Sequence, residues 1–244
     1  MPLNFFHSDI EALIQGKKPL RLAGRKSPLS VIQISEIEST LKKIYPRMQF
    51  ERILVETMGD LDKTTPLRLI KAENFFTNTV DRLISLKKCD AGIHSAKDLP
   101  QTLPSDLTLV AVTKSIASGD SLVYHPSLSL PLPKRLIIGT SSANRYRTVK
   151  NLFPDCIVKD IRGNVNERLS RLYQKKFDGI VVADAALIRL KTDIKHKIPL
   201  PPPYAPLQGS LAIIALKTRK NLKLLFRAID IVVCRKTLPN DQGP

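Results

Sequence analysis

A serine, a lysine and a carboxylate follow a short apolar run in residues 93–100, Ile-His-Ser-Ala-Lys-Asp-Leu-Pro. The preceding Ala91-Gly92-Ile93 is typical of the end of a strand. In open α/β sheets, ligands bind at the carboxyl ends of strands, where loop side chains converge. We therefore expect Ser95, Lys97 and Asp98 in a reactive site. An ordinary strand-to-helix turn whose aspartate caps a helix is the alternative.

Three strand-to-helix junctions could position further functional groups. Each is expected to combine the end of a strand, the start of a helix and at least one arginine. In the first, residues 20–23 are expected to form a strand, and Arg25 follows. Ser27 and Pro28 suit an N-cap and the first position of a helix that runs toward Ile44. The spacing of its apolar residues places most of them on one face; they are Leu29, Ile32, Ile37, Leu41 and Ile44.

The second junction joins a strand at residues 135–139 to a hydroxyl-rich turn. Thr140, Ser141 and Ser142 form that turn, and the helix after it carries Arg145. Hydroxyls and unpaired backbone N–H groups are expected to meet there.

The third junction follows a strand at residues 156–158. Arg162 precedes Asn164, and Glu167 three residues later completes a capping pattern for a helix with Arg168 on its polar side. Helix N-termini beside arginines suit carboxylates or phosphates, because N–H groups and guanidinium groups both donate to anions. The arginine candidates are Arg25, Arg145, Arg162, Arg168 and Arg189. Well-capped helices without a ligand remain the alternative at each junction.

The charge of the chain favours an anionic partner. Lys and Arg number 39 against 22 Asp and Glu, which gives a formal net charge of +17 and a pI near 9.9. The basic residues are scattered, aromatic content is only 5%, and there is no Trp, so base stacking has little support. We expect a small polyanionic substrate and no nucleic acid.

Several other classes of protein and site are not indicated. No apolar stretch approaches the roughly 20 residues of a membrane span, so a soluble cytoplasmic protein is expected. Cys89, Cys156 and Cys234 are far apart and lack His or Cys partners at zinc-site spacing, so neither disulfides nor a metal is expected. No P-loop or dinucleotide fingerprint occurs.

The chain is expected to form two α/β lobes around a central cleft. Residues 1–115 with 207–230 are predicted to form domain 1, residues 116–200 domain 2, and residues 231–244 a tail. The proline-rich segment 198–206 stiffens the connection, and residues 207–215 are expected to return to the first lobe as a strand.

The order of motifs resembles the porphobilinogen deaminase (hydroxymethylbilane synthase) family over about residues 20–215. The segments that carry the resemblance are 24–29 (GRKSPL), 59–60 (GD), 94–100 (HSAKDLP), 139–142 (GTSS), 161–165 (IRGNV) and 207–209 (LQG). The resemblance implies lobes like those of type II periplasmic binding proteins. It also implies a transferase of heme and porphyrin biosynthesis that condenses four porphobilinogen units to a linear tetrapyrrole and releases ammonia.

The resemblance also implies roles for single residues. Asp98 is implied as the catalytic carboxylate, with Lys97 beside it. The implied substrate- and cofactor-carboxylate ligands are Arg25, Ser27, Ser95, Thr140, Ser141, Ser142, Arg145, Arg162, Arg168 and Arg189. The implied supporting residues are Gln33, Asp60 and Phe76.

The family's cofactor is a dipyrromethane primer attached to a cysteine of a third domain. Residues 209–244 are fewer than the roughly 50 that a domain needs, so we expect that domain to be absent. Cys234 lacks the attachment motif, so the usual attachment cysteine is expected to be absent too. One hypothesis is a shortened synthase with a non-covalent primer or a partner chain that replaces the third domain. The other is a catalytically reduced binding protein for porphobilinogen or another small polycarboxylate.

Overall fold

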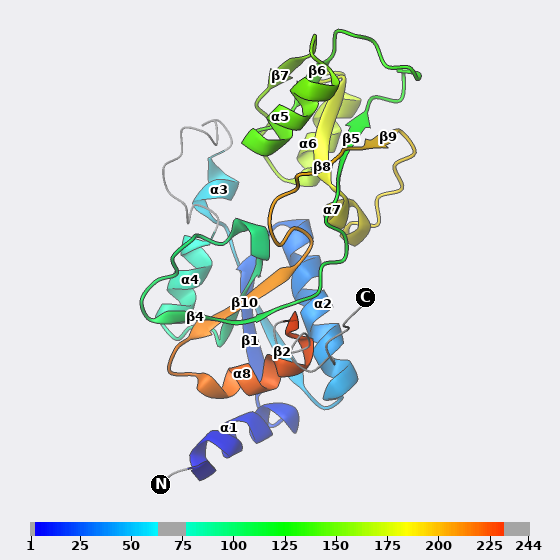
Figure 1. The fold of residues 1–244 in the computed structure, drawn as a ribbon. Helices are drawn as coiled ribbons and strands as arrows, with labels where there is room; N and C mark the ends of the chain where they lie inside the picture. The colour runs from blue at the N-terminus through cyan, green and yellow to red at the C-terminus, as the bar shows by residue number, and fades with distance from the viewer. Residues whose placement is uncertain (1–2, 63–76, 232–244) are drawn as a thin grey trace, which may run out of the picture. The chain divides into compact units, whose positions relative to one another are not determined.

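The computed structural model describes residues 3–62 and 77–231, with side chains from Asp9 onward. Phe76 and Cys234 therefore lie outside the described residues. The chain divides into two compact units (Figure 1). Unit 1 holds the described residues of Met1–Thr57, Phe76–Lys114 and Ser210–Pro244, and unit 2 holds those of Met58–Phe75 and Ser115–Gly209.

Unit 1 is built on a five-stranded mixed sheet of order β2-β1-β3-β10-β4. The first three strands are parallel, whereas β10 is antiparallel to both of its neighbours. The strands are β1 (Pro19–Arg25), β2 (Gln49–Val55), β3 (Ala91–Ser95), β4 (Leu107–Val112) and β10 (Leu211–Leu216). The helices are α1 (Leu3–Ile14), α2 (Pro28–Ile44), α4 (Asn78–Ser85) and α8 (Lys220–Phe226), with the 3₁₀ turns η2 (Ala96–Asp98) and η3 (Arg227–Ile229).

Unit 2 repeats this topology with the order β7-β6-β8-β5-β9. Here β5 is the strand that runs antiparallel to its two neighbours. The strands are β5 (Asp120–Tyr124), β6 (Ile137–Gly139), β7 (Ile157–Lys159), β8 (Gly179–Ala183) and β9 (Lys197–Pro199). The helices are α3 (Met58–Leu61), α5 (Ala143–Leu152), α6 (Val165–Tyr173) and α7 (Asp184–Arg189).

Apolar layers cover both faces of the unit 1 sheet. Helices α2 and α8 pack on one face, where Ile37 and Phe226 join Leu22 and Ile213 in a buried cluster. Helix α4 packs on the other face through Val80 and Ile84. Strands covered on both faces are nearly continuous apolar runs in the sequence, as β10 is. Unit 2 has its own cluster, which joins α5 to β5, β6 and β8.

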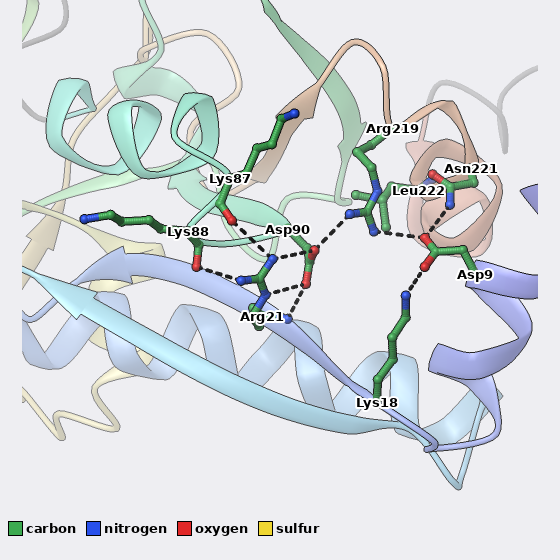
Figure 2. Close-up of polar contacts among 9 residues, drawn as sticks. All are labelled: Asp9, Lys18, Arg21, Lys87, Lys88, Asp90, Arg219, Asn221 and Leu222. Carbon is green, nitrogen blue, oxygen red and sulfur yellow. Dashed lines mark hydrogen bonds and ion pairs between the residues drawn. The ribbon is translucent and has the colours of Figure 1, made fainter.

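A network of charged side chains links α1 and the residue before α8 to the amino ends of β1 and β3 (Figure 2). Asp90 accepts hydrogen bonds from the backbone N of Arg21 at 2.9 Å and from Nη1 of Arg219 at 3.1 Å. Arg219 also donates to Asp9 of α1 at 3.2 Å, and Lys18 forms an ion pair with the same carboxylate. This network lies at the opposite ends of the parallel strands from Arg25 and Ser95.

The structure confirms the first predicted helix but changes its buried face. Helix α2 begins at Pro28, with Ser27 as its N-cap, and ends at Ile44. Ile44 is 42% exposed, contrary to expectation, whereas the polar residues Gln33 and Glu38 are buried. They are buried because they have partners: Gln33 bonds Ser95, and Glu38 forms an ion pair with Arg52. The returning strand β10 begins at Leu211, after the segment 207–210.

Candidate functional site

Ser95, Lys97 and Asp98 lie at the carboxyl end of β3. Ser95 ends the strand, and residues 96–98 form a single 3₁₀ turn, not the longer helix that a capping aspartate would begin. Lys97 and Asp98 are half-buried on this turn. The turn is attached to β10 because the backbone N of Ala96 donates to the carbonyl of Ser210 at 3.0 Å. The backbone therefore presents both charged side chains from a fixed edge of the sheet.

Gln33 supports the same edge from α2. Its Nε2 donates to Oγ of Ser95 at 3.0 Å, although 62 residues separate the two along the chain. Arg25 ends the neighbouring strand β1, and Ser27 caps α2 by accepting from the backbone N of Ser30 at 3.4 Å. Unit 1 thus brings Gln33, Ser95 and the 96–98 turn together, with Arg25 and the N-terminus of α2 following the adjacent strand.

The three hydroxyl groups of the turn at residues 140–142 in unit 2 differ in their hydrogen bonds. Oγ of Ser141 donates to the carbonyl of Ile161 and accepts from its backbone N, both at 3.0 Å. Thr140 is 4% exposed, and its Oγ1 accepts from the backbone N of Ser142 at 3.3 Å. Ser142 is the N-cap of α5, and its side chain makes no capping hydrogen bond. Of the three hydroxyls, that of Ser142 is best suited to a ligand.

Arg145, on the first turn of α5, is paired with Asp120 at the start of β5. Its Nε donates to Oδ2 at 3.1 Å and its Nη2 to Oδ1 at 2.5 Å, and both side chains are largely buried. Gln208 lies on the same carboxylate and donates from Nε2 to Oδ1 at 3.0 Å. A substrate carboxylate at Arg145 would share the guanidinium with Asp120.

The remaining arginines of unit 2 are directed by backbone carbonyls. Arg162 is 5% exposed and donates from Nη2 to the carbonyl of Asp62 at 2.8 Å. Arg168 donates from Nε to the carbonyl of Gly163 at 2.9 Å, next to the confirmed capping box of Asn164 and Glu167. A guanidinium group that donates to a backbone carbonyl has its plane fixed, and a planar carboxylate needs a donor group of fixed orientation.

Two further candidates have distinct surroundings. Arg189, at the end of α7, is 8% exposed and donates from Nη2 to the carbonyl of Gly209 at 2.9 Å. Asp60 is half-buried on the short helix α3.

The sequence alone did not identify three residues that contact the candidate site residues or lie beside them. Asp120 and Gln208 surround Arg145, but their sequence positions are 25 and 63 residues away, which no local pattern reveals. His94 was read only as part of the tract, yet it is buried and faces Asp81 of α4. The four polar or charged residues among the five that follow Ile93 were the one signal that this strand end is unusual.

The two described cysteines are not suited to act as thiolates. Burial, aided by the charge of Asp90, raises the pKa of Cys89 to about 12. Burial also raises the pKa of Cys156. Among residues 3–62 and 77–231, no group of His, Cys, Asp and Glu side chains could hold a metal ion, and no helix is long and apolar enough to cross a membrane.

Solved structures of low sequence identity share the fold. The VFT2 domain of Bordetella pertussis BvgS matches with a TM-score of 0.53 and 11% identity, over 98% of this chain and 94% of that one. The BenM effector binding domain with its effector benzoate matches with a TM-score of 0.51 and 13% identity, over 93% and 98%. At such identities the likeness shows the fold alone, which is that of two type II periplasmic-binding-like lobes.

Sequence relatives identify the family. The family model described as porphobilinogen deaminase, dipyromethane cofactor binding domain, matches residues 20–224. A probable porphobilinogen deaminase of Chlamydia trachomatis serovar D is 46% identical, over 88% of this chain and 89% of the relative. Porphobilinogen deaminase of Nostoc sp. is 33% identical, over 88% of this chain and 68% of the relative. The chain belongs to the porphobilinogen deaminase family.

Proposed function

We propose that this protein is a hydroxymethylbilane synthase, a transferase that condenses four porphobilinogen units to a linear tetrapyrrole and releases ammonia at each step. The observation that carries the proposal is the placement of Asp98. Its carboxylate is half-buried on the turn after β3, with Lys97 beside it and a backbone hydrogen bond from Ala96 to Ser210 fixing the turn. Family membership supplies the reaction that such a carboxylate would serve.

The reaction needs a carboxylate because positive charge develops on the substrate. The aminomethyl nitrogen of porphobilinogen takes up a proton and leaves as ammonia, and the remaining azafulvene is cationic. The α-carbon of the terminal pyrrole attacks the exocyclic methylene, forms the new C–C bond and then loses its proton as the ring regains aromaticity. Asp98 stabilises the ring cation electrostatically and accepts hydrogen bonds from pyrrole N–H groups.

The same substrate carries an acetate and a propionate, so the growing chain is polyanionic. In unit 1, Arg25 and the N-terminus of α2 capped by Ser27 are proposed to bind carboxylates. In unit 2, the proposed ligands are Ser142, Arg145, Arg162, Arg168 and Arg189, with Thr140 and Ser141 shaping the turn that presents Ser142. Arginine suits this role because its rigid fork binds a carboxylate in a fixed plane.

The residues present also fit the dipyrromethane cofactor. It carries the same carboxylates as the substrate, and buried guanidinium groups with carbonyl-fixed orientations match them. When bound, it supplies the pyrrole α-carbon to which the first unit is joined. We infer that neither Cys89 nor Cys156 holds it, because both thiols are buried and have raised pKa values.

Mass spectrometry tests how the cofactor is held. We expect a denatured chain without the added mass of a dipyrromethane and a native spectrum that includes it, as a non-covalent primer requires. A partner chain would appear in the same native spectrum. A denatured chain that keeps the added mass would instead prove a covalent primer, and peptide mapping would locate it.

Porphobilinogen consumption by the purified chain, with mass spectrometry of the products, tests the proposed activity. Wild-type protein should make the tetrapyrrole, and Asp98→Asn should lose condensation while it keeps its fold by circular dichroism. Asp106→Asn is the matched control, because it makes the same chemical change at an exposed position. Tight porphobilinogen binding by the wild type without turnover would favour the binding-protein hypothesis.

A further inference from the structure

A histidine and an aspartate form a buried pair next to the turn of residues 96–98, which carries the proposed catalytic Asp98. Nε2 of His94, in β3, lies 3.2 Å from Oδ1 of Asp81, in α4, and their side chains are only 4% and 3% exposed. His94 is the residue before Ser95 and four positions before Asp98. The proposed catalytic carboxylate and this pair therefore belong to one short segment of backbone.

The pair lies in an apolar layer that offers it little else. Val80 and Ile84, on either side of Asp81 in α4, pack with Ala23 and Ile214 in a buried cluster. Within the described part of the chain, neither oxygen of Asp81 nor Nε2 of His94 meets the geometry of a hydrogen bond with any group, the other member of the pair included. The 3.2 Å approach of the two side chains is therefore a close polar contact between buried groups that no other described hydrogen bond holds.

Gly92 makes the approach of β3 to α4 possible. A Cβ at this position would lie 2.8 Å from Cγ1 of Val80, 2.9 Å from Cδ1 of Ile84 and 3.2 Å from Nε2 of His94. Gly92 and His94 share one face of β3, because side chains alternate along a strand. Ser95 points to the other face and receives the hydrogen bond from Gln33 of α2. Polar contacts from two helices therefore reach opposite faces of the last two residues of β3.

Stability alone is a poor reason for such a pair. Removing two polar groups from water costs several kcal/mol, and apolar replacements of buried ion pairs are often neutral or stabilising. A close contact between two buried polar side chains does, however, link the two backbone segments that bear them, because separating the pair would leave both groups buried without a polar neighbour. Carboxylates act on a developing charge only when they are correctly placed, and misplacement by about 1 Å can cost a factor of about 100 in rate.

We propose that His94 and Asp81 are positioning residues that hold the end of β3 against α4, so that the turn with Lys97 and Asp98 has a single orientation. The inference rests on the proposed function, because it assigns these residues to the same reaction. Neither residue contacts the substrate in this scheme. Their loss should lower kcat more than it changes KM.

Four variants test the proposal. His94→Leu removes the ring donor, whereas His94→Gln keeps an N–H donor near the position of Nε2. Asp81→Asn removes the carboxylate with little change of shape. If His94→Leu fails to fold, Asp81→Asn is measured in its place. Val80→Ala is the control, because it opens a cavity in the same helix without touching the polar pair.

We expect kcat to fall by about tenfold to 100-fold in His94→Leu. His94→Gln should recover most of that loss, and Val80→Ala should keep kcat within about twofold although it lowers the melting temperature. A His94→Leu enzyme with wild-type kcat, or a loss of kcat in Val80→Ala proportional to its loss of stability, would overturn the proposal.

Amide hydrogen exchange supplies a readout that does not depend on turnover. The N–H group of Ala96 attaches the turn to Ser210, and that of Leu99 closes the turn on the carbonyl of Ala96. His94→Leu should speed their exchange relative to other core amides, and Val80→Ala should not. Unchanged exchange would contradict the positioning role. If the wild type shows no turnover, the proposed function fails, and these exchange rates still decide the inference.

Discussion

Arg145 binds the carboxylate of Asp120 through two hydrogen bonds, one from Nε at 3.1 Å and one from Nη2 at 2.5 Å. Gln208 donates to the same carboxylate, so the guanidinium is oriented within unit 2 without any ligand. The arrangement places a rigid, planar cation on the first turn of α5, where the N-terminal dipole also favours an anion. It predicts that the shape of Arg145, and not only its charge, matters for binding.

Arg145→Lys tests that prediction. Lysine keeps the charge but cannot bind two carboxylates in one plane, so we expect KM for porphobilinogen to rise about tenfold with a smaller change in kcat. Arg147→Lys is the matched control, because Arg147 is exposed on the same helix. Equal KM values for the two variants would show that Arg145 serves structure only.

Arg168→Gln should weaken porphobilinogen binding. A hydrogen bond to a charged group contributes about 1.5–3 kcal/mol, so the dissociation constant is expected to rise by at least about tenfold. Isothermal titration calorimetry measures it directly, and Arg135→Gln controls for net charge at an exposed site. If Arg168→Gln binds porphobilinogen as tightly as the wild type does, the junction before α6 is only a capped helix and not an anion site.

The network around Asp90 predicts acid sensitivity. Burial alone would raise the pKa of the Asp90 carboxyl, but hydrogen bonds from the side chain and backbone of Arg21, with the charge of Arg219, hold it below its ordinary value. The pKa of an aspartate in the unfolded chain is about 3.9. A carboxyl whose pKa is lower than this in the folded protein stabilises the fold above that pH, and the stabilisation is lost as the pH falls from there through the folded pKa. Unfolding free energy should therefore decline below about pH 4.

Asp90→Asn separates this network from other acid-sensitive groups. The variant should lose about 2 kcal/mol of unfolding free energy at pH 7, because a charged acceptor with several donors is replaced by a neutral one. Its stability should also depend less on pH in the acid range than that of the wild type. Denaturant unfolding at pH 7, 5 and 3.5 measures both effects, and parallel pH curves would contradict the assignment.

Thiol labelling checks the described cysteines. The raised pKa of Cys89, about 12, and its burial leave almost no reactive thiolate at pH 8. Iodoacetamide should therefore leave Cys89 and Cys156 unmodified in the native protein and label both after unfolding in guanidinium. Rapid native labelling of either residue, located by peptide mapping, would show that its surroundings open in solution.

Local signals were enough to predict several elements. The Ser27 and Pro28 pair defines the start of α2, and Asn164 with Glu167 forms the expected capping box. Such caps involve residues three positions apart, so a single sequence contains both partners. The strand before Ser95 was also anticipated, because apolar runs that end at polar turns are typical of α/β sheets.

Contacts between distant segments could not be predicted in this way. Gln33 and Glu38 are polar residues buried in α2, because Ser95 and Arg52 provide partners that allow their burial. The pairing of His94 with Asp81 and the closeness of Gly92 to α4 likewise depend on tertiary packing. A helical wheel ranks residues by polarity alone, so it assigns such polar groups to solvent.

Strand β10 also determines the order in which a nascent chain can mature. It lies between β3 and β4 in the sheet of unit 1, yet the ribosome makes it only after the whole segment 115–209 of unit 2. Until Leu216 has emerged, β3 and β4 have no strand to join them, whereas the strands of unit 2 are already complete. The middle of the polypeptide is thus able to fold before its beginning, the reverse of the usual N-terminal-first course of synthesis.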